Sequence, residues 1–144
     1  GLSILDFGVA FEGYTSDTTL TVVKDATDEQ KKLVELVEKA AKEALPYYKN
    51  GEKIKMAGLV ADEVFKKAKR EMPHTLGHGI GLEIHEFPRV SAKQSDDLVF
   101  KPGMIVTLEP GLYDSKLGGA RLENDVLITE DGNEVITHSK IIYR

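Results

Sequence analysis

Residues 73–88 read Pro-His-Thr-Leu-Gly-His-Gly-Ile-Gly-Leu-Glu-Ile-His-Glu-Phe-Pro, and the amino-acid composition of the chain changes at this stretch. Three histidines, His74, His78 and His85, fall within twelve residues, with glycines among them. Glycine lets the backbone come close to a ligand, and imidazole is a common ligand of transition metals. A lone histidine is more often an ordinary core residue, but three among glycines indicate a binding site, here for a metal.

Two amphipathic helices are predicted on the N-terminal side of this stretch. The sequence Thr27-Asp28-Glu29-Gln30 matches a capping box, in which the Thr and Gln side chains satisfy backbone N–H groups at the helix start. Pro46 and Asn50-Gly51 mark the end of this helix. The predicted apolar faces consist of Leu33, Val37, Ala40, Ala41 and Ala44 in the first helix, and of Met56, Val60, Val64 and Ala68 in the second.

A hairpin of two strands is predicted at the N-terminus. Ser3 to Phe11 is an apolar, aromatic-rich run that is typical of a buried strand, and Thr18 to Val23 is rich in β-branched residues. Glu12-Gly13-Tyr14 provides a turn between them, so we expect the two strands to pair.

Three more strands are predicted beyond the histidines, at residues 104–108, 121–129 and 134–142. A polar loop at 91–97 precedes them, and Asp131-Gly132 supplies a hairpin turn between the last two. Strands, two helices and strands again, in this order, indicate an α+β fold. The length of 144 residues fits one domain, residues 1–144.

The composition argues against several classes of function. A net charge of −5 argues against general nucleic-acid binding and against a basic helix on a membrane surface. The absence of cysteine excludes disulfides, thiolate metal sites and cysteine nucleophiles. No apolar run approaches the roughly 18 residues of a membrane span, and no signal-peptide pattern opens the chain, so we expect a cytoplasmic protein. The chain begins Gly1-Leu2-Ser3 rather than with Met, which suggests a piece of a longer protein.

Four carboxylates stand where such residues are unfavourable. Asp6 interrupts an apolar strand, Asp17 precedes the next one, Glu109 ends a predicted strand and Glu123 interrupts another. A buried, ionised carboxylate needs a cation, a hydrogen-bond network or a metal. In the predicted hairpin, Asp6 and Asp17 come opposite each other and repel unless a proton or a cation lies between them. Taken alone, these two aspartates are better explained without a metal, by one Asp in a hydrogen-bonded turn and the other on an exposed strand edge.

The histidines change this balance. One histidine and four carboxylates would form an oxygen-rich site that suits Mn²⁺ or Co²⁺, with Zn²⁺ or Fe²⁺ as further options. Four carboxylates around two divalent ions leave no excess charge, which makes burial of the cluster tolerable. The carboxylates of such a site could bridge two divalent metal ions.

Several short motifs follow one another in a specific order. They are Asp6 with Asp17 eleven residues later, Gly77-His78-Gly79-Ile80-Gly81, His85-Glu86-x-Pro88, Pro102-Gly103-Met104, Thr107-Leu108-Glu109-Pro110-Gly111 and Gly119-Ala120-Arg121-Leu122-Glu123-Asn124-Asp125. With them, nearly the whole chain resembles the C-terminal part of the catalytic domain of pita-bread-fold metallopeptidases. This family includes methionine aminopeptidase, aminopeptidase P and prolidase (Xaa-Pro dipeptidase). The resemblance implies a curved, mostly antiparallel sheet with helices on its outer face.

The resemblance also implies the roles of the metal ligands. Asp6 would chelate one metal ion, and Asp17 and Glu123 would bridge both ions. His78 and Glu109 would complete the coordination of the second ion. A hydroxide shared by the two ions would be the nucleophile, and Glu109 would serve as general acid and base.

Two further histidines and an arginine receive roles from the same resemblance. His85 would hydrogen-bond the substrate or the developing oxyanion, and His74 would shape the substrate pocket, so both are expected at the catalytic and substrate-binding site. Arg89 is a candidate to bind the terminal carboxylate of a dipeptide, because a guanidinium makes bidentate contacts. An arginine on the surface after a turn is the equally weighted alternative. Arg121 is expected to support metal ligands, and Glu86 either to support the site or to be merely exposed.

Within the family, the pattern Gly-Gly-x-Arg-x-Glu-x-Asp and the pair Pro73-His74 favour the proline-specific branch. The implied activity is hydrolysis of Xaa-Pro bonds in short peptides, foremost dipeptides. Aminopeptidase P and methionine aminopeptidase of the same fold are the alternatives. A non-catalytic binding domain is disfavoured because all five ligand positions are filled, and a metal-binding fragment without turnover stays open.

Two departures from the family pattern are present. Leu20 stands where the family often has arginine. The family's catalytic domain also has another α/β unit before the first ligand strand, and prolidases add a further N-terminal domain. Without these parts one wall of the pocket would be missing and apolar surface would be uncovered, so we expect a homodimer or other self-association.

Overall fold

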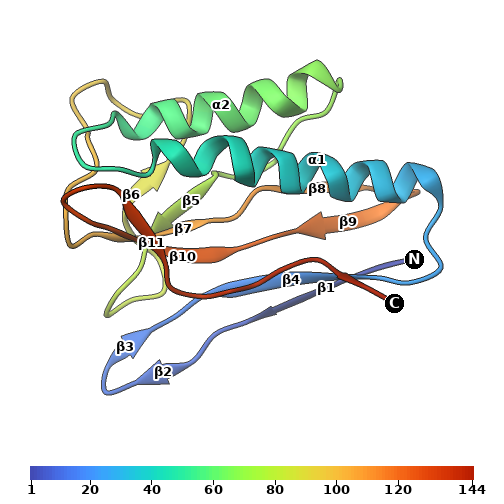
Figure 1. The fold of residues 1–144 in the computed structure, drawn as a ribbon, viewed down its shortest axis with the longest axis horizontal. Coiled ribbons are helices and arrows are strands. Elements are labelled where there is room, and N and C mark those ends of the chain that lie inside the picture. The colour runs from blue at the N-terminus through green and yellow to red at the C-terminus, as the bar shows by residue number, and fades with distance from the viewer.

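The computed structural model describes residues 1–144, which run from strands through two helices back to strands (Figure 1). The first strands are β1 (Leu2–Phe7), β2 (Ala10–Phe11), β3 (Tyr14–Thr15) and β4 (Thr18–Val23). Helices α1 (Asp28–Ala44) and α2 (Ile54–Lys67) follow, with a 3₁₀ turn at Leu45–Tyr47 between them. The remaining strands are β5 (Gly77–Gly79), β6 (Glu86–Val90), β7 (Ile105–Leu108), β8 (Gly111–Asp114), β9 (Gly118–Arg121), β10 (Asn124–Ile128), β11 (Asn133–Val135) and β12 (Ile142–Tyr143). The predicted α+β class is confirmed.

Two larger sheets meet at one point. The five-stranded sheet has the order β11-β10-β7-β5-β6 with antiparallel pairing throughout. The three-stranded sheet has the order β1-β4-β12, in which only β12 runs parallel to its neighbour. An antiparallel bridge between Thr19 and Glu123 joins the two sheets. Two of the acidic motifs are therefore brought together by backbone pairing.

Both helices lie on one side of the sheets (Figure 1), and neither is both long and apolar enough to cross a membrane. Thr27 forms the predicted capping box with Gln30, whose side chain also donates to the carbonyl of Leu117 at 2.7 Å. Gln30 thus fixes the start of α1 against the turn between β8 and β9. The predicted apolar face of α1 is buried apart from the half-buried Ala41.

The buried face of α2 differs from the prediction. Met56 and Val60 are only half-buried, whereas Ala57, Gly58 and Ala61 are buried. A Cβ added to Gly58 would lie 2.4 Å from a backbone nitrogen of the segment after β6. Small residues therefore let α2 approach the backbone closely, and this packing determines the buried face more than the spacing of the large apolar residues does.

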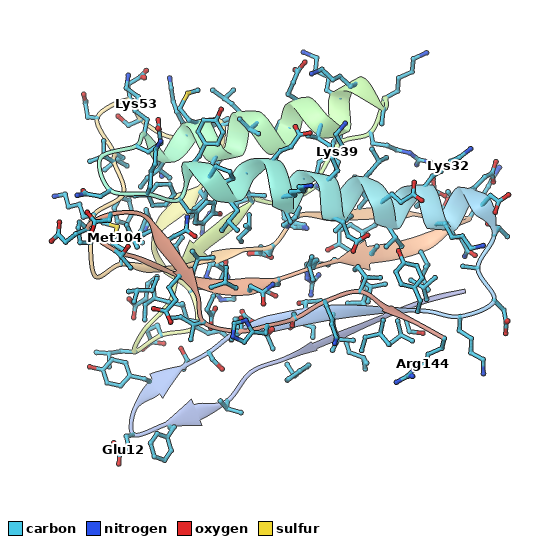
Figure 2. The ribbon with its side chains drawn as sticks, viewed as in Figure 1. Glu12, Lys32, Lys39, Lys53, Met104 and Arg144 are labelled. Atoms are coloured by element: carbon cyan, nitrogen blue, oxygen red, sulfur yellow. The ribbon has the colours of Figure 1, made fainter.

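The prediction of one buried strand at residues 3–11 is wrong. The run is divided into β1 and β2, and its large side chains are exposed, with Leu5 at 50% and Phe7 at 53%. β1 is an edge strand that pairs only with β4, and β2 and β3 form a small hairpin that projects from the body, with Glu12 at its tip (Figures 1 and 2). The apolar pattern predicted a strand correctly but could not reveal that its outer face has no neighbour in this chain.

Three short strands, β5, β6 and β8, were not predicted. β5 and β6 lie within and after the histidine stretch, and β8 precedes the glycines of β9. The predicted strand at 134–142 is two short strands, β11 and β12, that belong to different sheets. Glycine has a low intrinsic propensity for strands, so β5 is not expected from its residues alone. In the structure, close contact between neighbouring backbones compensates for this low propensity.

Candidate metal centre

The five predicted metal ligands converge from segments far apart in the sequence. Ligand atoms of Asp6, Asp17 and Glu123 all lie within 4.8 Å of one another, and so do those of His78, Glu109 and Glu123. Glu123 belongs to both groups, which makes it the centre of the cluster. These two groups can each hold a cation only if Glu123 is shared between them.

Asp6 and Asp17 are neighbours, but not in the predicted way. Asp6 on β1 pairs in register with Thr19 of β4, and Asp17 lies just before that strand. The two aspartates are therefore diagonal neighbours rather than directly opposite each other. Because side chains alternate along a strand, Asp17 and Thr19 share the face that Asp6 presents.

His78 is presented by a strand that only glycine neighbours allow. A Cβ on Gly77 would lie 1.9 Å from the carbonyl oxygen of Thr107, and one on Gly79 would lie 2.4 Å from that of Phe87. The Nδ1 of His78 is 3.0 Å from the carbonyl oxygen of Gly79. A carbonyl can only accept, so Nδ1 carries the proton and Nε2 keeps its lone pair. Burial lowers the pKa of His78, which favours the neutral form that binds metals.

The carboxylates of the cluster oppose one another when no cation is bound. Burial, reinforced by Glu109, raises the pKa of Glu123 to about 8. Burial raises the pKa of Glu109 to about 7, and Asp17 adds to this effect. The pKa of Asp17 is raised by burial and by its neighbour Asp6. Each group would ionise more easily beside a divalent cation, so the oxygen-rich donor set fits such ions.

Arg121 and the hydroxyl groups around it hold the carboxylates from the side. Arg121 donates to a carboxylate oxygen of Asp6, to Oγ1 of Thr19 at 3.1 Å and to the hydroxyl of Tyr113 at 2.7 Å. Thr19 in turn donates to Oε2 of Glu123 at 2.5 Å. Contact with a ligand was expected of Arg121, whereas Thr19 and Tyr113 were missed. Thr19 could have been found from its position two residues after Asp17, but nothing in the sequence points to Tyr113.

His74 and His85 lie next to different ligands of the cluster. The Nδ1 of His74 is 4.0 Å from Oε2 of Glu109, and its Nε2 is 3.1 Å from the Tyr113 hydroxyl. The exposed His85 stacks at an angle on His78 with 4.4 Å between ring centroids. His85 also lies within ligand distance of Asp17 and His78. Both histidines are therefore near the cluster, and their catalytic and substrate-binding roles stay predictions.

Arg89 and Glu86 have different surroundings. Arg89 pairs in register with His78 across β5 and β6, so it shares the face of the sheet that carries His78. It is exposed, and its guanidinium makes no hydrogen bond to the protein. Glu86 accepts a hydrogen bond from the backbone N–H of Glu83 at 2.8 Å. Glu86 thus orders the turn before β6, while Arg89 is available to a ligand.

Comparison with known proteins agrees with this geometry. Residues 1–130 match the model of metallopeptidase family M24. The Xaa-Pro dipeptidases of Pyrococcus furiosus and Pyrococcus horikoshii are 42% and 39% identical to the chain over 142 residues, which is 96% of this chain and 40% of theirs. The chain thus spans about two fifths of the length of these curated relatives.

Solved structures show the same fold. The prolidase from Pyrococcus horikoshii OT3 superposes with a TM-score of 0.91 at 37% identity, over 97% of this chain and 41% of that one. The methionine aminopeptidase from Rickettsia prowazekii gives a TM-score of 0.82 at 25% identity, over 95% of this chain and 64% of that one. The predicted pita-bread fold is confirmed.

Proposed function

The chain belongs to metallopeptidase family M24, and on this premise we propose that its acidic cluster is the centre of a metal-dependent peptidase that hydrolyses Xaa-Pro bonds in dipeptides. The observation that carries the proposal is the convergence of His78 with four carboxylates around the shared Glu123. Asp17, Glu109 and Glu123 are largely buried and Asp6 is exposed. The four carboxylates repel one another, and cations would remove that repulsion.

Two divalent ions, foremost Mn²⁺ or Co²⁺, fit this donor set. Asp6, Asp17 and Glu123 would hold one ion, and His78, Glu109 and Glu123 the other, with Asp17 within reach of both groups. Bound at these positions, the ions would supply Lewis acidity and lower the pKa of a coordinated water. Four carboxylates would balance the charge of two divalent ions.

The chain's own residues would then position the substrate and carry protons. Glu109 faces His78 on one oxygen and His74 on the other, so it is placed to accept a proton and return it to a leaving amine. The Tyr113 hydroxyl accepts a hydrogen bond from Arg121 and donates one to Nε2 of His74. The Nδ1 of His74 donates to the carbonyl of Thr75, and these contacts orient that imidazole beside Glu109. The exposed His85 is placed to donate a hydrogen bond to a substrate carbonyl at the open side of the cluster.

Arg89 supports a dipeptide as the substrate. Its guanidinium has no protein partner and shares the face of His78, so it is available to a substrate's terminal carboxylate. Aminopeptidase P and methionine aminopeptidase remain the alternatives within the family. A non-catalytic domain is less well supported because the whole ligand set is present.

A second copy of this chain is the partner we propose for the open face of the three-stranded sheet. Leu5 and Phe7 on β1 and Leu20 on β4 lie on the face opposite Asp6, with no charged side chain among them. β1 also has a free edge for strand pairing. Because the chain carries a net charge of −5, copies would associate through a neutral surface such as this one.

The metal centre is tested by calorimetric titration of the metal-free chain with Mn²⁺, alongside Glu123→Ala. Two ions per chain, with much weaker binding in the variant, support the proposal. Absence of binding at millimolar Mn²⁺ contradicts it. Hydrolysis of an Xaa-Pro dipeptide, a longer Xaa-Pro peptide and a Met-peptide by the loaded chain then separates the three activities of the family.

A further inference from the structure

Two buried residues stand directly behind the ligands of the cluster. Thr107 on β7 and Asp125 on β10 are cross-strand partners in the five-stranded sheet, and the two strands run side by side (Figure 1). Thr107 has no exposed surface, and 3% of the surface of Asp125 is exposed. Partners directly opposite each other share one face of a sheet, so both side chains belong to the same layer.

Thr107 connects two ligands that come from different strands. Its Oγ1 accepts the backbone N–H of His78 at 3.0 Å and donates to Oε1 of Glu109 at 3.4 Å. Its carbonyl accepts the hydroxyl of the buried Tyr48 at 3.0 Å. One hydroxyl, held by the core, therefore sets the distance between His78 and Glu109.

Asp125 holds a third ligand, Asp17. Its Oδ2 accepts the backbone N–H of Asp17 at 3.2 Å, across a sequence separation of 108 residues. Its Oδ1 is buried and has no hydrogen-bond partner. No other buried side-chain nitrogen or oxygen atom in the structure lacks a partner. A buried, half-satisfied carboxylate next to other carboxylates is unfavourable in the protein alone. Its charge becomes favourable when cations occupy the cluster in front of it.

We infer that Thr107 and Asp125 form a positioning pair that holds His78, Glu109 and Asp17 at the separations a cation requires, and that the charge of Asp125 strengthens cation binding from behind Asp17. The inference rests on the proposed metal centre but not on the proposed substrate. Asp125 and Thr107 belong to none of the ligand groups and contact the ligands instead, so both would act through the ligands.

The variant Asp125→Asn separates a positioning role from a structural one. It keeps the shape and an acceptor for the Asp17 N–H but removes the charge. At pH 8 we expect the metal-free variant to be more stable to urea than the parent chain, yet to bind Mn²⁺ at least about tenfold more weakly. A purely structural residue would lose stability and leave the Mn²⁺ affinity of the folded chain unchanged. Thr137→Val is the matched control, because it removes the acceptor of the Asp125 backbone N–H and no contact to a ligand.

The pair is tested further with Thr107→Val and Thr107→Ser. The valine variant loses the hydroxyl and is expected to bind Mn²⁺ at least about tenfold more weakly, and the serine variant to regain most of the affinity. Combined with Asp125→Asn, the loss is expected to be less than the product of the single effects, because both residues act on one site.

Calorimetry distinguishes failure of this inference from failure of the proposed function. If the parent chain binds Mn²⁺ while Asp125→Asn and Thr107→Val bind it equally well, the positioning pair is refuted and the metal centre stands. If the parent chain binds no Mn²⁺, the metal centre fails and the inference falls with it. Binding without hydrolysis of any of the three peptides indicates a metal-binding fragment without turnover and leaves the positioning pair intact.

Discussion

The Nε2 atom of His78 lies 3.3 Å from Oε1 of Glu109, and neither atom carries a proton when the carboxylate is ionised. Two lone pairs that face each other repel unless a proton or a cation lies between them. In the metal-free protein, a proton on either of the two groups relieves this contact. The same gap would bind a divalent cation when one is available.

The stability of the metal-free chain is therefore expected to fall as the pH rises. Burial raises the pKa of Glu109 to about 7 and that of Glu123 to about 8, from an ordinary value of 4.5. The folded chain binds protons more tightly than the unfolded chain, so this contribution is complete below pH 4.5 and is lost as the pH passes through 7 and 8. Urea unfolding in EDTA between pH 5 and pH 8.5 measures the slope.

Two comparisons control this measurement. Saturating Mn²⁺ should reverse the slope, because protons compete with the metal for the same carboxylates. The double variant Glu109→Gln/Glu123→Gln should flatten it. A flat profile in the parent chain would show that these carboxylates titrate normally in the folded state.

A single substitution, Glu123→Gln, should move stability and metal binding in opposite directions. The amide keeps an acceptor for the Thr19 hydroxyl but removes a buried charge that both ligand groups share. The metal-free variant is expected to unfold at a higher urea concentration than the parent at pH 8 and to bind Mn²⁺ at least about 100-fold more weakly. Asp96→Asn, at an exposed carboxylate that pairs with Lys53 and Lys55, is the control. Equal metal affinity in Glu123→Gln and the parent would remove Glu123 from the site.

Much of this site could be predicted from residue types, and the reason is physical. A carboxylate in an apolar strand is conspicuous without a structure, and Glu123 is indeed buried. Asp6 was found by the same argument, although its side chain is exposed in the structure. Thr27 and Gln30 likewise define a helix start locally. The supporting residues Thr19, Thr107 and Asp125 were missed because they are ordinary in a strand until the partner strand is known.

The errors have a common origin. Each error depends on the neighbouring segment of the chain. This holds for the exposure of β1, for the face of small residues that α2 buries, and for the glycine-containing strand β5. Local pattern describes one chain segment, whereas close packing between segments decides burial and register.

Gly77 offers a test of that close packing. An alanine Cβ at this position would lie 1.9 Å from the carbonyl oxygen of Thr107, which is backbone and cannot turn aside. Gly77→Ala is expected to lower the free energy of unfolding by about 3 kcal/mol or to prevent folding, since overpacking typically costs 1–3 kcal/mol. Gly132→Ala, where the added methyl meets open space, should change it by less than about 0.5 kcal/mol. Similar unfolding curves for both variants would show that β5 and β7 are farther apart than described.

The open face of β1 predicts association between copies. Replacing Leu5 and Phe7 by lysine places two charges on a neutral apolar face. We expect the parent chain to scatter light as a dimer or larger species at micromolar concentrations, and Leu5→Lys/Phe7→Lys as a monomer. Leu59→Lys, at an exposed leucine on α2, should behave like the parent. A monomeric parent chain, or association that survives the double substitution, would exclude this face as the contact.

Arg89 decides whether the site is built for dipeptides. If its guanidinium binds a terminal carboxylate, Arg89→Met should weaken binding of Ala-Pro by at least about tenfold, which corresponds to 1.4 kcal/mol. Binding of Ala-Pro amide, which lacks that carboxylate, should change little. Calorimetry of the Mn²⁺-loaded chain with both ligands measures the difference without requiring turnover, and Lys93→Met controls for loss of a nearby positive charge. An equal loss for both ligands, or none for either, would make Arg89 an ordinary surface residue and would favour an aminopeptidase that accepts longer peptides.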